Sequence, residues 1–402
     1  MSAVPASLHR PCVWPYVRLH DRLAVRARRL ALRGLLLAAC LTSFSASAQA
    51  PANAPESVPV NTSAKAPTAA DKAAPLAVAL LLPAAGTPFG RAADVVRQGV
   101  FAARAQGDAE TALQVIEIDE RPESVATAVA RARELGARVV LGPLLRDQAA
   151  AAVRLRDRLP MVTLSQPERD ADAAPTLLAF GLSIEQEARQ IVAAALRLRS
   201  SAAGTAPRFV VMVGESPLAR RAGLAFRNEL AAAGERSIAV PFAARQETLV
   251  AIGESLAASP PDAVLLALDA RDAATLRPRL PRELPVFATS MVNLGGAQGT
   301  LLAPDLEGVV FVDLPWLLEP DHPAVMVYPR PEQPLSAELQ RLYALGIDGY
   351  RLALEWAQGR SAFTLDGVTG FITVDRALSA RTERRPGFAV FRSGRIERLE
   401  VQ

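Results

Sequence analysis

The sequence predicts an α/β protein with two lobes, each a doubly wound and mostly parallel sheet. Short unbroken apolar runs such as residues 76–82 are typical of strands that are covered on both faces. A turn rich in Gly and Pro follows this run, and then apolar residues recur at helical spacing. The same strand, turn and helix order repeats along the chain, which indicates parallel strands joined by crossover helices.

The N-terminal segment has the three parts of an export signal. A basic stretch reaches Arg33, and the apolar run 34–44 and the small residues "SASAQA" follow it. The apolar run is too short to span a bilayer, so we expect a signal peptide over residues 1–48 that is cleaved before Gln49. An alternative is a lipoprotein box ending at Cys40, in which case the signal covers residues 1–39 and Cys40 carries the lipid. Either signal predicts a periplasmic protein.

Charge and cysteine content exclude several classes of function. The formal net charge is +4, but the first 48 residues carry more positive charge than that, so the remainder of the chain is mildly acidic. We therefore expect no nucleic-acid partner. Cys12 and Cys40 are the only cysteines, so the part of the chain after the signal has no disulfide and no cysteine nucleophile.

Residues 49–74 differ in composition from the rest of the chain. They are rich in Ala, Pro, Ser and Thr and show no apolar periodicity. Such a segment buries too little apolar surface to order itself, so we expect a disordered tether.

The first series of units predicts one lobe. We expect strands at 76–82, 112–119, 137–143 and 160–167, and helices at 124–135 and 147–159. The carboxyl ends of parallel strands lie along one rim of the sheet, where backbone amides and hydroxyls can hold a small ligand. The ligand-binding candidates on this rim are Thr87, Pro88, Phe89, Gly142, Pro143 and Ser165.

A second series predicts the other lobe. We expect helices at 184–198, 218–233 and 247–258, and strands at 207–216, 236–242, 261–270 and 285–292. The rim candidates here are Ser216, Thr289 and Ser290, although Ser216 also suits the N-cap of the following helix. The remaining chain returns to both lobes, and we expect 75–183 with about 289–360 in the first lobe and 184–288 with about 361–402 in the second.

A long helix is expected over residues 336–358. Its apolar residues recur at helical spacing and predict a buried stripe. Asp348 lies just off this stripe, and two interpretations stay open: the carboxylate faces a ligand cleft, or it makes a helix–helix hydrogen bond.

Several kinds of catalytic and metal chemistry are missing from the sequence. Beyond the signal His322 is the only histidine, and the two lysines, Lys65 and Lys72, both lie in the tether. This excludes a Ser-x-x-Lys acyl-enzyme site and a His/Cys metal cluster. Residues 214–218 nearly match a nucleophile elbow, but Leu218 occupies the place where that turn needs Gly. We expect no enzyme, no metal and no cofactor.

Five segments carry a family resemblance. They read "VALLLPAAGTPFGRAADVVRQGV", "VVLGPLLRDQAAAAVRL", "FGLSIEQEARQI", "RLYALGIDGYRLA" and "LDGVTGFITVD", and residues 345–350 are the nearest match. In these segments the chain resembles the LppC family of penicillin-binding-protein activators, over about residues 75–402. That family's best-known members carry a helical-repeat domain before this fold, where this sequence has the tether.

The resemblance implies a hinged, two-lobe type I periplasmic-binding-protein fold. It also implies a non-catalytic role: the protein would bind and activate a class A penicillin-binding protein, a bifunctional peptidoglycan synthase, from an outer-membrane lipid anchor. The alternative is a solute receptor of an ABC transporter for a small amino-acid-like ligand. Such a receptor needs convergent charges for a zwitterion, whereas the expected strand ends carry hydroxyls, glycines and apolar residues.

Overall fold

The structure is a computed structural model that describes residues 77–400 except 108–110, 156, 168–172 and 199–207. The expected signal peptide, the tether and Cys40 lie outside these residues. None of the helices in the described ranges is long and apolar enough to cross a membrane.

The first lobe is built on a five-stranded sheet in which every pairing is parallel. In spatial order its strands are β2 (Ala112–Ile118), β1 (Ala77–Pro83), β3 (Val139–Leu141), β4 (Met161–Thr163) and β5 (Leu177–Ala179). Residues 78–82 are at most 2% exposed, as expected for an apolar run that is covered on both faces.

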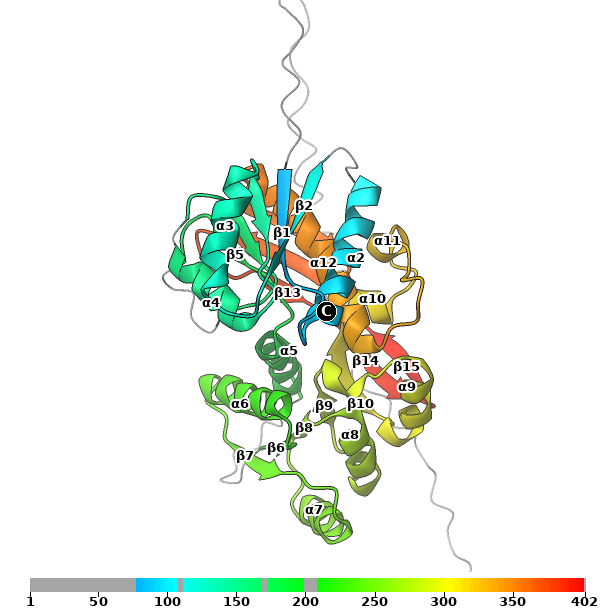
Figure 1. Cartoon of the computed structure of the whole chain (residues 1–402). Coiled ribbons are helices and arrows are strands. Elements are labelled where there is room, and N and C mark those ends of the chain that lie inside the picture. Colours follow the sequence, from blue (N-terminus) through cyan, green and yellow to red (C-terminus); the bar gives the residue numbers. More distant parts are fainter. Residues whose placement is uncertain (1–76, 108–110, 156, 168–172, 199–207, 401–402) are drawn as a thin grey trace, which may run out of the picture. The chain divides into compact units, whose positions relative to one another are not determined.

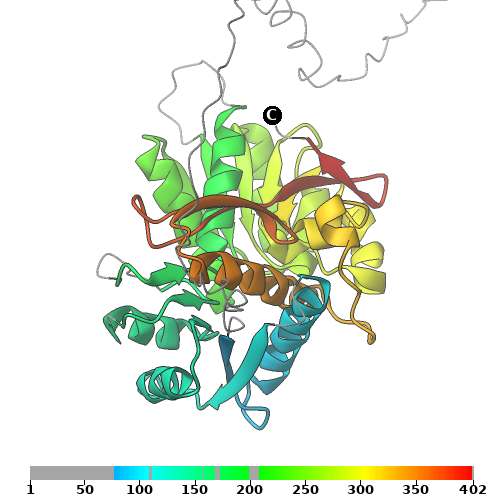
Figure 2. The same ribbon diagram turned by 90° about the horizontal axis from the view of Figure 1, so that it is seen from above.

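Helices cover both faces of this sheet (Figure 1). They are α2 (Gly90–Gly107), α3 (Ser124–Glu134), α4 (Arg146–Leu155) and α12 (Ala337–Ala357). Val78, Leu80 and Leu82 pack with α2 and α12, whereas Ala79 and Leu81 pack with α3 and α4. The alternation of side chains along β1 therefore divides the apolar core into two layers. Figure 2 shows α12 lying alongside α2.

The second lobe is built on a seven-stranded sheet. In spatial order its strands are β15 (Arg395–Leu399), β14 (Gly387–Arg392), β10 (Val309–Asp313), β9 (Val286–Ala288), β8 (Ala263–Ala267), β6 (Phe209–Val213) and β7 (Ser237–Pro241). Strands β6 to β10 are parallel, and the β14–β15 hairpin is antiparallel.

The helices of the second lobe also form two layers. They are α5 (Ile184–Leu196) and α6 (Pro217–Ala232) on one face, and α7 (Gln246–Ala258), α8 (Ala270–Leu276) and α9 (Gly296–Leu302) on the other. Short 3₁₀ helices follow at η2 (Arg277–Arg279), η3 (Ser290–Val292) and η4 (Ala303–Leu306).

A small antiparallel sheet completes the first lobe. Its strands are β11 (Ala362–Gly367), β12 (Gly370–Asp375) and β13 (Glu383–Arg385), and the short helices α10 (Pro315–Leu318) and α11 (Pro323–Met326) precede it. Val368, Ile372 and Val374 join the core formed by α2 and α12, which assigns this sheet to the first lobe.

The α/β fold class with parallel sheets is confirmed, but the expected lobe boundaries need correction at two places. Residues 289–360 were expected in the first lobe, whereas β10 pairs with β9 and β14 in the seven-stranded sheet. Residues 361–402 were expected in the second lobe, whereas β11 to β13 pack on the first. The chain therefore crosses between lobes at about residues 180–184, 313–315 and 385–387.

Candidate functional site

Buried charged side chains gather at the three crossings. We call them the crossover cluster, and its members are Glu187 on α5, Asp313 at the end of β10, Arg341 and Asp348 on α12, and Arg384 in β13. Four of them are at most 6% exposed, and the Arg341 side chain is 11% exposed. Charges so far from water need partners within the fold.

An ion pair of the cluster joins the two lobes. Arg341 donates from Nε to Asp313 Oδ1 at 2.9 Å and from Nη2 to Oδ2 at 2.7 Å, a bidentate arrangement. Asn293 Nδ2 donates to the same carboxylate at 2.8 Å. Burial disfavours the charged guanidinium, but Asp313, together with Glu187 and Glu338, outweighs that effect, and the pKa of Arg341 is raised. This pair ties α12 to the end of β10.

Glu187 is held by the turn that follows β9. Its carboxylate accepts from the Ser290 backbone N–H at 2.9 Å and from Ser290 Oγ at 3.1 Å. Burial raises the pKa of Glu187, and the nearby Arg384 offsets this only in part. Thr289 is fully buried, and its Oγ1 has no hydrogen-bond partner in the described structure. Thr289 and Ser290 were predicted as ligand contacts, but Ser290 is occupied by a side chain of the same chain.

Asp348 supports the small sheet of the first lobe. Its carboxylate accepts from the Val368 N–H at 3.2 Å, and from the Thr369 N–H and Thr369 Oγ1, both at 2.7 Å. Arg351 Nη1 donates to it at 3.1 Å. Burial raises the pKa of Asp348, and Arg351 opposes that shift. Asp348 is fully buried and its partners are the β11–β12 turn and Arg351, so neither interpretation from the sequence describes its contacts.

Hydrogen bonds join the strand ends at the predicted rim of the first lobe. The Gly142 N–H donates to the Val162 carbonyl at 2.7 Å, and the Leu164 N–H donates to the Pro143 carbonyl at 2.9 Å. Gly142 has a φ of 111° and no room for a Cβ, because the Leu81 carbonyl lies against it. The carbonyl of Ser165 accepts from Thr163 Oγ1 at 2.8 Å. Gly142, Pro143 and Ser165 therefore lie at neighbouring strand ends, as the sequence predicts.

The other rim candidates have structural contacts of their own. Thr87 Oγ1 donates to the Ala84 carbonyl at 2.9 Å within the turn after β1. Pro88 and Phe89 are exposed in the same turn, Phe89 by 43%. Ser216 is the N-cap of α6, because its Oγ accepts from the Ala219 N–H at 3.0 Å.

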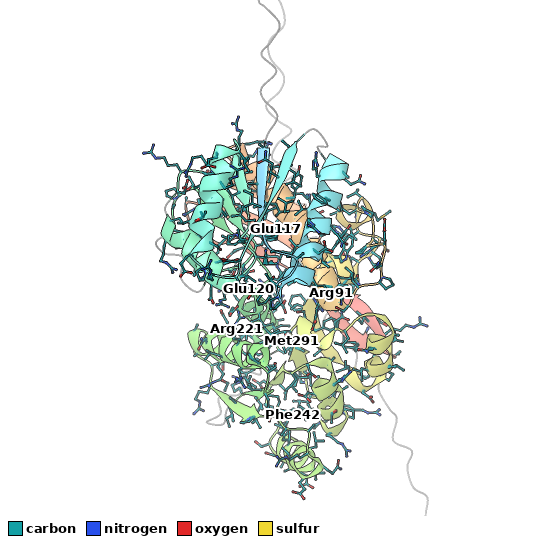
Figure 3. The ribbon with its side chains drawn as sticks, in the orientation of Figure 1. Arg91, Glu117, Glu120, Arg221, Phe242 and Met291 are labelled. Carbon is teal, nitrogen blue, oxygen red and sulfur yellow. The ribbon has the colours of Figure 1, made fainter. Side chains whose placement is uncertain are left out.

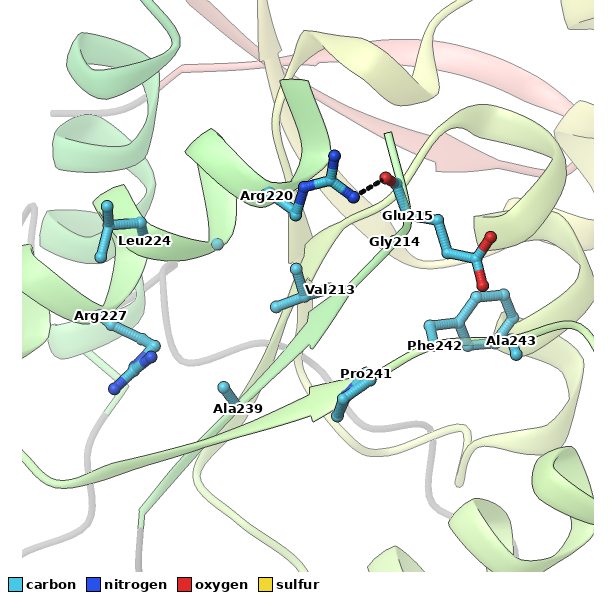
Figure 4. A pocket seen from close by; sticks show the side chains of 11 residues that line it. Val213, Gly214, Glu215, Arg220, Leu224, Arg227, Ala239, Pro241, Phe242 and Ala243 are labelled. Atoms are coloured by element: carbon cyan, nitrogen blue, oxygen red, sulfur yellow. Dashed lines mark hydrogen bonds between the residues drawn. The ribbon is translucent and has the colours of Figure 1, made fainter. Parts of the chain in front are cut away.

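Two pockets lie beside edge strands, and none of the predicted ligand contacts lines either of them. One, of about 280 Å³, is lined by residues of α2, β1 and β2, including Arg91 and Glu117, which Figure 3 labels. The other, of about 420 Å³, lies between α6 and the strands β6 and β7 (Figure 4). Within the described residues, no group of three or more His, Cys, Asp or Glu is arranged to hold a metal ion.

Sequence reasoning missed four members of the crossover cluster. They are Glu187, Asp313, Arg341 and Arg384. One signal was available: Arg341 and Asp348 are seven residues apart on one helix, so both lie on the same face of α12. Asp313, which ends the apolar run of β10, is a second signal of a buried charge that needs a partner.

Comparison with known families gives a match over most of the chain. The model of the LppC family, described provisionally as lipoproteins, matches residues 65–394. A curated relative from Edwardsiella piscicida, the penicillin-binding protein activator LpoA, is 27% identical over 313 residues, which cover 67% of this chain and 44% of the relative. LpoA of Vibrio cholerae is 26% identical over 351 residues, 77% of this chain and 56% of the relative. The chain spans about half the length of these curated relatives.

Solved structures show the same fold. A Chromobacterium violaceum protein, named provisionally as a branched-chain amino acid ABC transporter, is 38% identical with a TM-score of 0.65, over 78% of this chain and 99% of that one. Full-length LpoA from Haemophilus influenzae has a TM-score of 0.65 at 20% identity, over 81% of this chain and 59% of that one. The second likeness concerns the fold alone. Together they confirm the type I periplasmic-binding-protein fold.

Proposed function

Because the chain belongs to the LppC family, we propose that it is a non-catalytic periplasmic protein that binds a class A penicillin-binding protein and activates this peptidoglycan synthase. The name of the curated relatives, penicillin-binding protein activator, supports this role. The absence of lysine beyond Lys72 and of cysteine beyond Cys40 supports a role without catalysis.

The observation that carries the proposal is the internal use of polar groups at positions where the sequence predicts ligand contacts. Ser290 bonds to Glu187, Ser216 caps α6, and Asp348 holds the β11–β12 turn. A receptor for an amino-acid-like ligand needs charged groups that are open to its cleft. In the described residues, the charged groups of Glu187, Asp313, Arg341 and Asp348 bond instead to groups of the same chain, and Arg384 donates from Nη1 to the Thr369 carbonyl while its Nε and Nη2 have no hydrogen-bond partner. The internal bonds of these four residues favour recognition of a protein partner over a zwitterion.

Activation by such a protein is a coupling between two sites. A partner that binds one arrangement of the synthase more tightly than another shifts the synthase toward that arrangement. The binding protein itself needs no reacting group for this. It needs a rigid surface, and the contacts between Arg341 and Asp313 hold the elements at the crossings in a fixed geometry.

The proposal includes export to the periplasm, with Cys40 as the lipid-carrying residue if the lipoprotein box is used. Fractionation of cells grown with labelled palmitate tests the anchor. Label in the wild-type protein that is absent from a Cys40→Ser variant supports the lipoprotein, whereas unlabelled protein in the soluble periplasmic fraction supports cleavage before Gln49.

The second candidate is a solute receptor of an ABC transporter. One observation favours it: the Chromobacterium violaceum protein is 38% identical and is covered over 99% of its length. The two functions differ in what stabilises the protein. A receptor gains thermal stability from its small ligand in proportion to ligand concentration and affinity.

The deciding experiment measures binding of the compact unit Lys72–Gln402 to detergent-solubilised class A penicillin-binding proteins from the same cell. Rates of glycan polymerisation and peptide crosslinking are followed alongside. We expect saturable binding and a raised rate. Absence of both well above micromolar concentration contradicts the proposal, and a melting temperature raised by amino acids then supports the receptor.

A further inference from the structure

The strand β7 leaves one side of the seven-stranded sheet open. It is the last strand in the spatial order, and in the described structure it pairs with β6 alone. Its sequence, Ser-Ile-Ala-Val-Pro, contains no charged residue. Soluble proteins usually protect a sheet edge with charges, proline or a covering segment, and β7 has only Pro241 at its end.

The direction of the backbone groups on β7 follows from one hydrogen bond. The Phe242 N–H donates to the Val213 carbonyl of β6 at 2.8 Å, so the backbone N–H and C=O of Phe242 point toward β6. Backbone groups alternate sides along a strand, so those of Ala239 and Pro241 face outward. Pro241 fits this assignment, because an edge strand tolerates proline where the N–H would face away from the sheet. Ala239 has no hydrogen bond from outside the sheet in the described structure.

A groove runs beside this open edge. We call it the edge groove, and its parts used here are Val213, Arg220, Leu224, Arg227, Ala239 and Pro241 (Figure 4). Its volume of about 420 Å³ is large enough for side chains of a bound segment. The walls are apolar, and Leu224 is 56% exposed.

The charges at the edge groove favour an acidic partner. Arg227 is exposed and has no ion pair among the described residues. Arg220 donates to the carbonyl of Glu215 and also has no acidic partner there. Glu215 is the one acidic residue that lines the groove, so arginines outnumber acids. Carboxylates on a bound segment can form pairs with both guanidinium groups.

The first lobe offers a comparison within the same chain. Its edge strand is β2, and the pocket of about 280 Å³ beside β2 has balanced charge, with Arg91 and Arg97 against Asp94 and Glu117. Arg97 is paired with Asp94, and β2 itself contributes the exposed Glu117. The first-lobe edge therefore has the charge protection that β7 lacks.

We propose that β7 and the edge groove receive an extended, acid-rich segment of a partner protein, which adds to the sheet as a further strand. The backbone of Ala239 pairs with this strand, its apolar side chains contact Val213 and Leu224, and its carboxylates bind Arg220 and Arg227. The inference rests on the proposed function in one respect: the segment is taken to belong to the synthase.

The test uses the unit Lys72–Gln402 and a fluorescent synthetic peptide in which every second residue is serine and the residues between are alternately valine and glutamate, so that both kinds of side chain lie on one face of the strand. A peptide with lysine in place of every glutamate is the control. We expect saturable binding of the acidic peptide. The change Ala239→Pro removes an outward N–H, and the double change Arg220→Glu with Arg227→Glu reverses the rim charge. Each is expected to weaken binding by about fivefold or more.

Val115→Pro on β2 is the matched control for Ala239→Pro. The Ile118 carbonyl accepts from the Ala84 N–H, so the backbone groups of Ile118 point toward β1. Backbone groups alternate sides along a strand, and those of Val115, three residues earlier, therefore point away from the sheet, like those of Ala239. Val115→Pro is expected to leave peptide affinity unchanged. Circular dichroism establishes that each variant is folded, and the arginine variant remains informative if Ala239→Pro unfolds the edge.

Three results overturn the inference: no binding of the acidic peptide, equal binding of the lysine peptide, or unchanged affinity in the arginine variant. The synthase assay separates the two proposals. If the synthase binds the wild-type unit and the arginine variant equally, the synthase does not bind at β7 and the edge groove, and the proposed function stands. If the acidic peptide binds at β7 but no synthase binds the wild-type unit, the proposed function fails, whereas β7 and the edge groove are still a binding site for an acidic extended segment.

Discussion

Gly346 of α12 lies so close to Val96 of α2 that a Cβ at residue 346 would collide with the Val96 carbonyl oxygen. Gly99 of α2 has the reciprocal relationship, since a Cβ there would collide with the carbonyl oxygen of Tyr343. The two helices therefore pack backbone against backbone. This contact explains why glycine stands at both positions: α12 can approach α2 this closely only where neither helix has a side chain.

The first prediction concerns this helix contact. Gly346→Ala forces α12 away from α2, so we expect the free energy of unfolding to fall by about 1–3 kcal/mol, as for other overpacked cores. Urea denaturation measures it. Gly107→Ala is the control, because nothing lies within 4 Å of a Cβ at that end of α2, and we expect a change within about 0.5 kcal/mol. Equal stability of the wild type and Gly346→Ala would show that the helices can separate freely.

The second prediction concerns the pair that joins the lobes. Arg341→Met leaves the buried Asp313 carboxylate without its guanidinium, and we expect a loss of about 3–5 kcal/mol in the free energy of unfolding. Adding Asp313→Asn to Arg341→Met is expected to cost less than the sum of the single changes. Arg131→Ala removes an exposed pair with Glu134 and is expected to change stability by under about 0.5 kcal/mol. Additive effects in the double variant would contradict direct coupling.

The third prediction concerns the pH dependence of stability. The raised pKa of Glu187 means that the folded protein holds this proton more tightly than the unfolded chain does. Its contribution is therefore complete below the ordinary glutamate pKa and is lost as pH rises toward the raised value. Arg384, Arg341 and Asp313 act on Glu187 from the neighbouring elements. In Glu187→Gln, we expect the free energy of unfolding to decline less steeply above about pH 4.5.

Glu185 on the same helix serves as the control, because its pKa is shifted in the opposite direction. Burial opposes its ionisation, but hydrogen bonds from Arg221 and Ser183 outweigh burial and lower the pKa of Glu185. Its contribution to stability is lost as pH falls through that lowered value. Glu185→Gln should therefore reduce stability at neutral pH and leave the decline above pH 4.5 in place. If the free energy of unfolding depends on pH in the same way in the wild type and in Glu187→Gln, the pKa of Glu187 is not raised in the folded protein.

The fourth prediction separates a structural serine from a catalytic one. Ser216→Ala removes the N-cap of α6 and is expected to lower the free energy of unfolding by about 1 kcal/mol. Ser216→Asp preserves a cap acceptor and should restore most of that stability. Synthase binding is expected to be unchanged in both variants, and a large loss of binding in Ser216→Ala with normal folding would place Ser216 at an interface instead.

The sequence was most informative where local chemistry decides the structure. Ser336 caps α12, and the helix spans Ala337–Ala357 as the apolar stripe predicts for 336–358. Ser216 caps α6 in the same way. Both features depend on residues three or four positions apart. Strand lengths were less accurate: residues 137–143 were expected as one strand, and β3 spans Val139–Leu141.

What could not be predicted depends on contacts between distant parts of the chain. The apolar run of β10 suits a buried strand in either sheet, and only its pairing with β9 and β14 decides which. Ser290 was correctly placed after a strand, but its partner Glu187 lies 103 residues earlier. A single sequence carries no signal for such a pairing, so a hydroxyl that bonds within the protein resembles one that awaits a ligand.

The three crossings also determine the order in which the protein can fold during synthesis. Val96 and Val100 of α2 need α12 to cover them, but the ribosome makes strands β6 to β10 of the other lobe first. The apolar face of α2 therefore stays uncovered until residue 357 has been made. A nascent chain in this state is a natural client for chaperones, and a truncated chain ending before α12 should aggregate rather than yield an independent first lobe.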